Sequence, residues 1–301
     1  MTDESAPMNL SIIRDSLPRL SQALKDFQSS SSTISILRNI NPPTSPSSSP
    51  RTLFILDSSF NPPSRAHLAL ASSVLTSPSS PYRYAQPWHL LLLFSTHNAD
   101  KAPSPASFTQ RIALMEIFAR DLLSHLKQLN ASTTIPIDVA VTKKPYYTDK
   151  STSIMESALY PSQPQHVHLC GFDTLTRIFE PKYYKSFDPP LSALEPYFDA
   201  GHRLRVMQRP DGEYGTAEEQ REYLEGLAEG RMEEQGGKRE WAEKVEMVEG
   251  EEGIGVSSTR VRRAAKGGDW KEVRRLCTEG VAEWVIGERL YEEDASGAKM
   301  A

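Results

Sequence analysis

The chain of 301 residues is 38% hydrophobic and 24% charged, which suffices for one large α/β domain or two small ones with a substantial core. A net charge of −5 gives no overall attraction to nucleic acid or to an anionic membrane. No run approaches the roughly 20 apolar residues of a membrane helix, and the acidic N-terminal sequence is not typical of a secretory leader. Two cysteines are too few for a disulfide framework, so we expect a cytoplasmic or nuclear protein with a local site for a small ligand.

The N-terminal region is predicted to lie outside the main domain. Residues 9 to 28 carry apolar side chains at alternating spacings of three and four, which predicts an amphipathic helix despite Pro18. A Ser/Pro-rich stretch follows, whose last part, residues 42 to 51, is typical of a flexible connection. Residues 1 to 51 are therefore interpreted as a helix plus linker, and the helix is a candidate docking element for an unidentified protein partner.

Alternating strand and helix patterns begin at residue 52. The nearly all-apolar runs at 52–57 and 88–95 are typical of strands that are covered on both faces in a parallel sheet. Further strands are predicted at residues 135–141, 166–170 and 203–208, and helices at residues 64–75, 108–129, 151–159 and 173–179. This order predicts an α/β fold with a Rossmann-like, doubly wound, mainly parallel sheet.

The C-terminal part differs in composition. Residues 211 to 252 are rich in Glu, which predicts a solvated helical insertion on the surface. Two or three helices are predicted after it, over the sequences VSSTRVRRAAKGGDWKEVRRLC and VAEWVIGERLYEE. The main domain is therefore expected to span residues 52 to 292, followed by a tail at 293–301.

The first candidate site is the sequence SSFNPPSRAH, which lies between the first of these strands and the next helix. Ligands of open α/β sheets bind at the carboxyl ends of strands, and the N–H groups of a helix N-terminus accept phosphate. Ser64 is a suitable N-cap, and His67 lies one turn on, where its imidazole could donate a hydrogen bond to phosphoryl oxygens. A lone helical histidine is also compatible with a structural role. The glycine-rich dinucleotide and P-loop fingerprints are absent from this loop.

The second candidate site is the sequence GVSSTRVRRA. Ser257, Ser258 and Thr259 precede a helical run, and they would supply a cap and a second phosphate-accepting helix N-terminus. The guanidinium of Arg262 would lie over the same helix end, where it could bind phosphates bidentately. Any capped basic helix can share this pattern, so it is the joint occurrence of both sequences that favours a phosphate site.

Together, the two motifs resemble those of the nucleotidylyltransferase superfamily, in particular the forms GSFNP-x-T-x-x-H and ISSTxxR of nicotinamide mononucleotide (NMN) adenylyltransferases. The residues that match the first form are Phe60, Asn61, Pro62 and His67. Ser64 stands where the family has Thr or His, and Ser58 stands where it usually has Gly. The chain is similar above all to the divergent fungal, promoter-of-filamentation branch of this family, and the resemblance covers residues 52 to 292.

Segments between the two motifs add further matches. HLCGFDTLTRIFEPKYY resembles the family's LCGxDxLxxFxxPxxW, which implies that Gly171 and Asp173 hold the adenosine side and the ribose of the nucleotide. An Asp after a strand is also an ordinary helix N-cap. Lys101 and Arg111 match basic positions near the phosphates or the mononucleotide, and a solvated surface position is the alternative for each.

The family stacks the nicotinamide ring on a Trp, and this chain has tyrosines there. Tyr183 and Tyr184 stand at one such position, and the sequence KKPYYTD lies near the other. Because tyrosine can also stack on a cationic ring, Tyr147 and Tyr184 are candidate mononucleotide contacts. Core or rim positions are the alternative for Tyr146 and Tyr147.

The resemblance implies an enzyme of NAD biosynthesis that transfers AMP from ATP to NMN, giving NAD and pyrophosphate. His67 and Arg262 would be its catalytic residues, acting on the charge that gathers on the leaving pyrophosphate. The implied contacts to ATP and its phosphates are Ser59, Phe60, Asn61, Ser64, Ser257, Ser258 and Thr259. Mg²⁺ is expected to accompany ATP, bound by phosphates and water, since the sequence shows no carboxylate cluster at ligand spacing and we name no protein metal ligand. His166 and His168 alternate on a strand, where a zinc pair is conceivable but ordinary packing is favoured.

Two other functions stay open on the sequence alone. One is a related enzyme that uses pantetheine phosphate, nicotinate mononucleotide or a cytidylyl donor, and the tyrosines in place of Trp leave room for it. The other is a nucleotide-binding regulator with weak ATPase activity, which Ser58 and the missing Trp favour. The presence of both His67 and the motif at residues 257 to 262 favours catalysis, because binding alone does not require groups that act in the transition state.

Overall fold

The computed structural model of the chain describes residues 10–43, 49–77, 83–97, 106–129, 135–210, 214–250 and 255–292. The candidate site residue Lys101 and the predicted tail at 293–301 lie outside the described residues.

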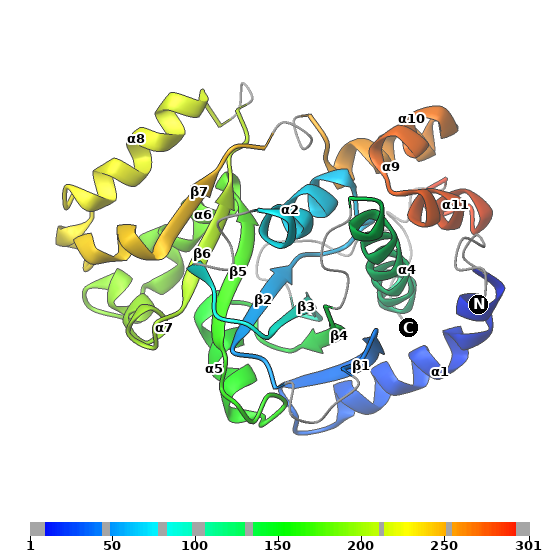
Figure 1. Cartoon of the computed structure of the whole chain (residues 1–301), viewed down its shortest axis with the longest axis horizontal. Coiled ribbons are helices and arrows are strands. Elements are labelled where there is room, and N and C mark those ends of the chain that lie inside the picture. Colours follow the sequence, from blue (N-terminus) through cyan, green and yellow to red (C-terminus); the bar gives the residue numbers. More distant parts are fainter. Residues whose placement is uncertain are drawn as a thin grey trace.

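The centre of the molecule is a seven-stranded sheet with the order β1-β4-β3-β2-β5-β6-β7 (Figure 1). Its strands are β1 (Ile34–Ile40), β2 (Thr52–Asp57), β3 (Trp88–Ser95), β4 (Ile137–Thr142), β5 (Gln165–Gly171), β6 (Arg203–Met207) and β7 (Val245–Val248). The strands from β4 to β7 are parallel to their neighbours, and β1 pairs antiparallel with β4. Without β1 this is the order of the doubly wound Rossmann fold, so the predicted class and sheet are confirmed.

The direction of winding reverses at β2. The chain passes from β2 through β3 to β4 on one side, and then returns to β5 on the other side of β2. The loops that follow β2 and β5 therefore diverge at the carboxyl ends of these strands, which is where ligands bind in sheets of this order. The first predicted motif follows β2, and Gly171 ends β5.

Helices cover both faces of the sheet (Figure 1). They are α1 (Leu10–Ser29), α2 (Arg65–Thr76), α4 (Phe108–Gln128), α5 (Tyr147–Glu156), α6 (Phe172–Ile178), α7 (Glu195–Asp199), α8 (Ala217–Ala228), α9 (Ser258–Lys266), α10 (Trp270–Leu276) and α11 (Glu279–Gly287). Short 3-10 helices are η1 (Pro181–Tyr184), η2 (Pro190–Leu194), η3 (Glu233–Gln235) and η4 (Arg239–Lys244). One face of the sheet, with Phe54 and Leu92, packs in a core shared with α1, α2, α4 and the C-terminal helices. The other face, with Leu91 and Leu93, packs on Ile154 of α5.

The N-terminal segment belongs to the same sheet and core. The predicted helix is present as α1, and its apolar face, with Leu20 and Phe27 buried, packs on the domain's own α4 and core. Residues 34–40, within the stretch interpreted as helix plus linker, form the edge strand β1, and Ile34 and Ile40 are buried. The expected domain boundary after residue 51 therefore separates two strands of one sheet, because alternating isoleucines make this short segment a strand with a buried face.

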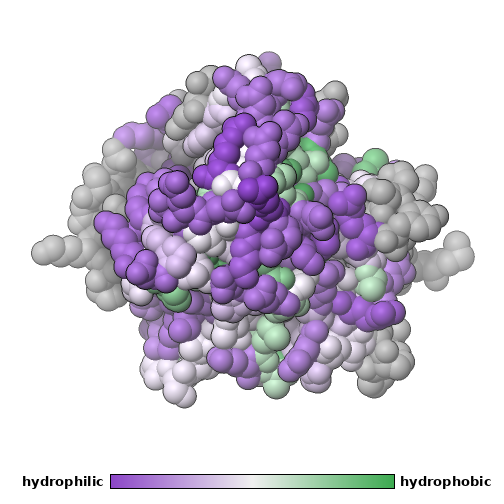
Figure 2. Space-filling model, turned by 90° about the vertical axis from the view of Figure 1, so that its left-hand side faces the viewer, coloured by the Kyte–Doolittle hydropathy of each residue, from purple (hydrophilic) through white to green (hydrophobic). Residues whose placement is uncertain are grey.

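The Glu-rich segment is more than a surface insertion. Its helix α8 is mainly exposed, and the face of the molecule that carries it is largely hydrophilic (Figure 2). The same segment contains Trp241, which is 1% exposed, and the last strand β7, which pairs with β6. A few apolar residues among many Glu side chains thus complete the sheet and a separate core cluster around α6 and α7.

Histidines and cysteines of the central strands are packed in the interior. The ring of His166 stacks on His202 at 4.2 Å, and Nδ1 of His168 lies 2.9 Å from the hydroxyl of Tyr197, in keeping with the packing predicted for this pair. Cys170 and Cys277 are free and buried. Among the described residues there is no group of three or more side chains that could hold a metal ion, and no helix long and apolar enough to cross a membrane.

Candidate active site

A buried ion pair marks the carboxyl end of β2. The carboxylate of Asp57, the last residue of the strand, binds the ammonium of Lys150 from α5, and these side chains are only 6% and 5% exposed. A buried charge is stable only beside a partner, so the pair ties the start of the first motif to α5. Sequence reasoning missed it because the two residues are 93 positions apart and neither lies in a motif.

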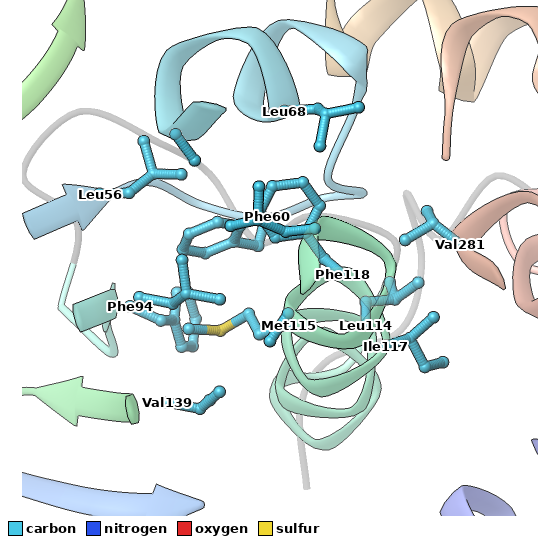
Figure 3. Packing of buried hydrophobic residues seen from close by; sticks show 14 of the residues in the cluster. Leu56, Phe60, Leu68, Phe94, Leu114, Met115, Ile117, Phe118, Val139 and Val281 are labelled. Carbon is cyan, nitrogen blue, oxygen red and sulfur yellow. The ribbon is translucent and has the colours of Figure 1, made fainter. Parts of the chain in front are cut away.

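Phe60 supports the motif from inside. Its φ of 44° is in the left-handed region, which costs free energy for a residue with a Cβ atom. The side chain is fully buried, with its ring centroid 5.5 Å from that of His67 and 6.5 Å from that of Phe118 in α4. Figure 3 shows Phe60 packed beside Phe118 in this core. Phe60 therefore packs beneath the imidazole, and the predicted contact of this residue with ATP could only come from its backbone.

The hydrogen bonds of His67 define its protonation. Nδ1 accepts the backbone N–H of Ser64 at 3.0 Å, and Oγ of Ser64 lies at the same distance. Nδ1 is therefore unprotonated, and the ring hydrogen is on Nε2, which lies 2.9 Å from Oγ of Ser58. Burial lowers the pKa of His67 to about 4, so the imidazole is neutral at physiological pH and can donate one hydrogen bond without carrying a charge.

The second motif docks directly on the first. Ser257 is the N-cap of α9, and the hydroxyl of Ser258 donates to the carbonyl of Pro62 at 2.8 Å. Arg262 donates through Nη1 to the carbonyl of Asn61 at 2.8 Å and through Nη2 to Oγ1 of Thr259 at 3.2 Å. Segments separated by 196 and 201 positions are thus hydrogen-bonded to the same short loop. The two motifs therefore meet at one loop.

A second arginine, Arg111, lies beside this contact. Arg111 is 6% exposed, donates to the carbonyl of Ala106, and has its guanidinium 5.5 Å from the rings of Phe94 and Phe108. Burial lowers the pKa of Arg111, and the positive charge of Arg262 lowers it further. The two guanidiniums are therefore close enough to repel each other.

Tyr291 connects this cationic region to the first motif. Its hydroxyl donates to Oδ1 of Asn61 at 2.9 Å, and the side chains of Tyr291 and Asn61 are both buried. Burial raises the pKa of Tyr291, against the effect of Arg111 and Arg262, so the phenol stays neutral. Sequence reasoning missed Tyr291, because a lone tyrosine after the last helix carries no motif signal.

The end of β5 brings a second group of residues to the site. Gly171 is the N-cap of α6, and a Cβ atom there would meet Oδ1 of Asp173 at 2.6 Å, a contact that the Asp173 side chain could relieve by turning away. The ring of Tyr147 lies 4.9 Å from that of His168 and 5.1 Å from Nζ of Lys150. Burial, and then the carboxylates of Asp57 and Asp173 among its neighbours, raise the pKa of Tyr147. Tyr147 therefore lies close to the ends of both β2 and β5.

Tyr184 is placed differently from Tyr147. It is 6% exposed, and its hydroxyl donates to the carbonyl of Ile178 at 2.8 Å, so the side chain is part of the core around α6. Its ring centroid lies 6.3 Å from that of Tyr146, which is 36% exposed. The structure thus brings the described candidates of the first and second motifs together at one loop. Gly171, Asp173 and Tyr147 lie near the end of β5. Tyr184 is enclosed below the surface.

Comparison with known proteins identifies the family of the chain. No protein-family profile matches the chain. A protein of Schizosaccharomyces pombe (strain 972 / ATCC 24843), named "Putative nicotinamide mononucleotide adenylyltransferase", is 33% identical over 269 residues, covering 89% of this chain and 94% of that protein. With this identity and coverage, the chain belongs to the family of NMN adenylyltransferases, which are nucleotidyltransferases.

Two solved structures are also similar to the chain at 15% identity. One is the Plasmodium falciparum nicotinic acid mononucleotide adenylyltransferase complexed with NaAD, with a TM-score of 0.48. The other is the same enzyme complexed with APC, with a TM-score of 0.44. Each comparison covers 81% of this chain and 98% of the other chain.

Proposed function

We propose that this chain transfers the adenylyl group of ATP to NMN and so produces NAD and pyrophosphate. An oxygen of the NMN 5′-phosphate attacks the α-phosphorus of ATP and forms a new P–O bond. The bond between the α-phosphorus and the oxygen that bridges to the β-phosphate breaks, and its electron pair leaves with pyrophosphate. Such a transfer needs alignment and charge neutralisation and no covalent intermediate on the protein.

The observation that carries this proposal is the contact between the two motifs. Hydrogen bonds from Ser258 and Arg262 to the loop at Asn61 and Pro62 fix the N-terminus of α9 beside the segment that leads to α2 and His67. Two helix N-termini and a guanidinium then surround one loop, and each of these groups is suited to bind phosphate. Arg262 would neutralise charge on the leaving pyrophosphate, and His67 would supply a neutral hydrogen-bond donor.

Ser59, Asn61 and Ser64 belong to this loop, and Ser257 and Thr259 lie at the start of α9, which is hydrogen-bonded to it. The backbone and hydroxyl groups of these residues are proposed as further ATP contacts. Ser59 is partly exposed, and Ser64 is buried, with its backbone N–H donating to Nδ1 of His67. We propose the end of β5 for the ribose, through the carboxylate of Asp173, with Gly171 allowing close approach.

Three further residues are proposed to act on the mononucleotide side. Tyr147 is suited to contact the ring of NMN, because it lies between the ends of β2 and β5 and its phenol stays neutral. Arg111 is suited to contact a phosphate beside Arg262. Tyr184, whose ring is enclosed, would act only through its neighbour Tyr146.

The residues at this site suit phosphates better than a metal ion. They offer a guanidinium, hydroxyls and backbone N–H groups, and the carboxylate of Asp57 is already bound to Lys150. Mg²⁺ would therefore be expected to arrive with ATP, held by phosphate oxygens and water, and to neutralise part of the triphosphate charge. A cytoplasmic or nuclear location for this reaction stays a prediction.

The activity is tested by incubating the purified full chain with MgATP and NMN and measuring NAD and pyrophosphate together. We expect both products in equal amounts. Parallel reactions with nicotinate mononucleotide or pantetheine phosphate as acceptor, and with CTP as donor, identify a related transferase if one of them is preferred. Binding of ATP without any dinucleotide or pyrophosphate would contradict the proposal and favour a nucleotide-binding regulator.

A further inference from the structure

The hydroxyl of Ser58 accepts the only hydrogen that the imidazole of His67 can donate. Because Nδ1 of the imidazole accepts the backbone N–H of Ser64, the only ring hydrogen is on Nε2. Oγ of Ser58 lies 2.9 Å from this nitrogen and must be the acceptor of that hydrogen. A single N–H cannot at the same time make a full, linear hydrogen bond to a phosphate oxygen.

The hydrogen of the Ser58 hydroxyl is available to a ligand. In the part of the chain that the structure describes, Oγ of Ser58 has no hydrogen-bond partner other than His67. Its backbone N–H donates to the carbonyl of Leu93 at 3.2 Å, which holds the residue at the carboxyl ends of β2 and β3. Ser58 is also partly exposed, so a bound molecule can reach it.

We propose that Ser58 is the group through which His67 acts on the nucleotide: its Oγ accepts the Nε2–H of His67, and its own O–H donates to a phosphate oxygen of ATP. This inference rests on the proposed function, which supplies the phosphate. The imidazole polarises the hydroxyl, because hydrogen bonds in a chain strengthen one another. His67 then positions Ser58 and does not contact the phosphates.

The arrangement explains why a neutral histidine suffices here. The imidazole needs only to donate to Ser58, and the hydroxyl passes the effect on to the phosphate without moving a proton. Arg262 provides the positive charge of the site, so a second charge on His67 is not required. Removing the hydroxyl would leave a gap of about one hydrogen-bond length, roughly 2.8 Å, between the imidazole and the nucleotide.

The first test compares Ser58→Ala with Ser58→Thr. We expect Ser58→Ala to lower kcat by about 100- to 1000-fold, at least as much as the loss of His67, because the donor to the phosphates is itself removed, and Ser58→Thr to keep most of the activity, because it retains a hydroxyl. Thr76→Ala, which removes an exposed hydroxyl from the far end of α2, is the control and should match the parent. A Ser58→Ala enzyme as active as the parent, or more active, would overturn the inference and mean that His67 contacts the phosphates directly.

A double-mutant cycle tests whether Ser58 and His67 act as one unit. If they do, Ser58→Ala combined with His67→Ala should lower kcat no further than Ser58→Ala alone. Effects that multiply would mean two independent contacts and would contradict the relay. Thermal unfolding of all variants separates this result from a loss of folded protein.

Binding measurements keep the inference testable apart from the activity. Calorimetric titrations of MgATP and adenosine should show weaker binding of MgATP to Ser58→Ala, restored in Ser58→Thr, and unchanged binding of adenosine. That pattern would support the relay even if no acceptor yields a dinucleotide, in which case only the proposed function fails. Equal weakening for both ligands would mean that Ser58 has a structural role and would overturn the inference.

Discussion

A carboxylate is buried at each end of the sheet, and the two carboxylates have different hydrogen-bonding and charged partners. At the carboxyl end, Asp57 of β2 is paired with the ammonium of Lys150. At the amino end, Asp138 of β4 accepts hydrogen bonds from Asn39 and Tyr160 at 2.6 Å, and Nε2 of His89 lies 2.8 Å from it. Burial alone would raise the pKa of Asp138, but the hydrogen bonds of these neighbours hold it below its ordinary value.

The difference between the two ends separates stability from function. At the amino end three side chains converge on a single carboxylate, and the cluster is closed within the protein. At the carboxyl end the donors of Arg262 bind backbone carbonyl and hydroxyl oxygens, and no carboxylate of the described residues forms an ion pair with it. Donors that are satisfied by neutral acceptors can still bind an anion, so substitutions at this end should act on turnover and those at the other end on folding.

The largest expected effect is on turnover. It is tested with two histidines, His67 at the carboxyl end of the sheet and His89 at the amino end. We expect His67→Ala to lower kcat by about 100- to 1000-fold, equivalent to about 2.7 to 4 kcal/mol, because a donor to the transition state, or the group that orients it, is lost. His89→Ala should leave kcat unchanged per folded molecule and lower the free energy of unfolding. Steady-state kinetics and urea unfolding measure both variants.

A result in which His67→Ala retains activity within threefold of the parent would remove His67 from the mechanism. If His89→Ala lowered kcat as much as His67→Ala, the separation between the two ends of the sheet would be wrong.

The second effect is on stability. Asp138→Ala leaves the donors of Asn39, His89 and Tyr160 without their acceptor inside the core, so we expect it to lower the free energy of unfolding by about 3 kcal/mol. Asp138→Asn keeps one acceptor oxygen and should cost less. Both are measured by urea denaturation, with kcat determined on the folded fraction. A loss under about 0.5 kcal/mol for Asp138→Ala, the size of an ordinary surface substitution, would show that water replaces the carboxylate and that this end is not closed.

The sequence predicted the carboxyl end of the sheet better than its edges or its amino end. The local structure around His67 and Arg262 could be predicted because each lies in a short pattern, a strand or cap followed by a helix, that is set by neighbours in the chain. Strands β1 and β7 were missed because they are short and surrounded by Ser or Glu, although alternating isoleucines in ISILRNI were a usable signal. Lys150 and Tyr291 were out of reach, because their partners are set by the topology of the whole sheet.

A third prediction concerns the buried histidines in the middle of the sheet. Burial lowers the pKa of His166 to about 3 and that of His202 to about 4, and Tyr197 and His168 pack beside them. The unfolded chain takes up protons below its histidine pKa of about 6.5 while the folded chain does not, so stability is present above that pH and lost as the pH falls toward 4. The expected slope is about 1.4 kcal/mol per pH unit for each histidine.

His202→Asn tests this slope, because the Asn oxygen can accept the backbone N–H of His166 in place of Nδ1. Urea unfolding at pH 7, 6 and 5 should show a weaker loss of stability in the variant than in the parent. Replacing the exposed His97 by Gln is the control, and it should keep the parent's dependence. An unchanged slope in His202→Asn would contradict the assignment of the acid sensitivity to this buried pair.

The smallest kinetic effect comes from a pair of tyrosines that each donate a buried hydrogen bond, Tyr291 to an amide oxygen at the carboxyl end and Tyr160 to a carboxylate at the amino end. Tyr291→Phe removes the donor to the side-chain Oδ1 of Asn61, and the backbone carbonyl of the same residue accepts a hydrogen bond from Arg262. We therefore expect the KM for ATP to rise roughly fivefold, or about 1 kcal/mol. Tyr160→Phe removes the donor to the carboxylate of Asp138 and should lower stability by about 1.5 to 3 kcal/mol, the range for a hydrogen bond to a charged group, with no change in KM. Because the two substitutions remove the same atom from a buried phenol, loss of packing should be equal in both. A rise in KM confined to Tyr291→Phe would assign the C-terminal segment to the nucleotide site, whereas equal kinetics with a loss of stability in both would assign Tyr291 to the core alone.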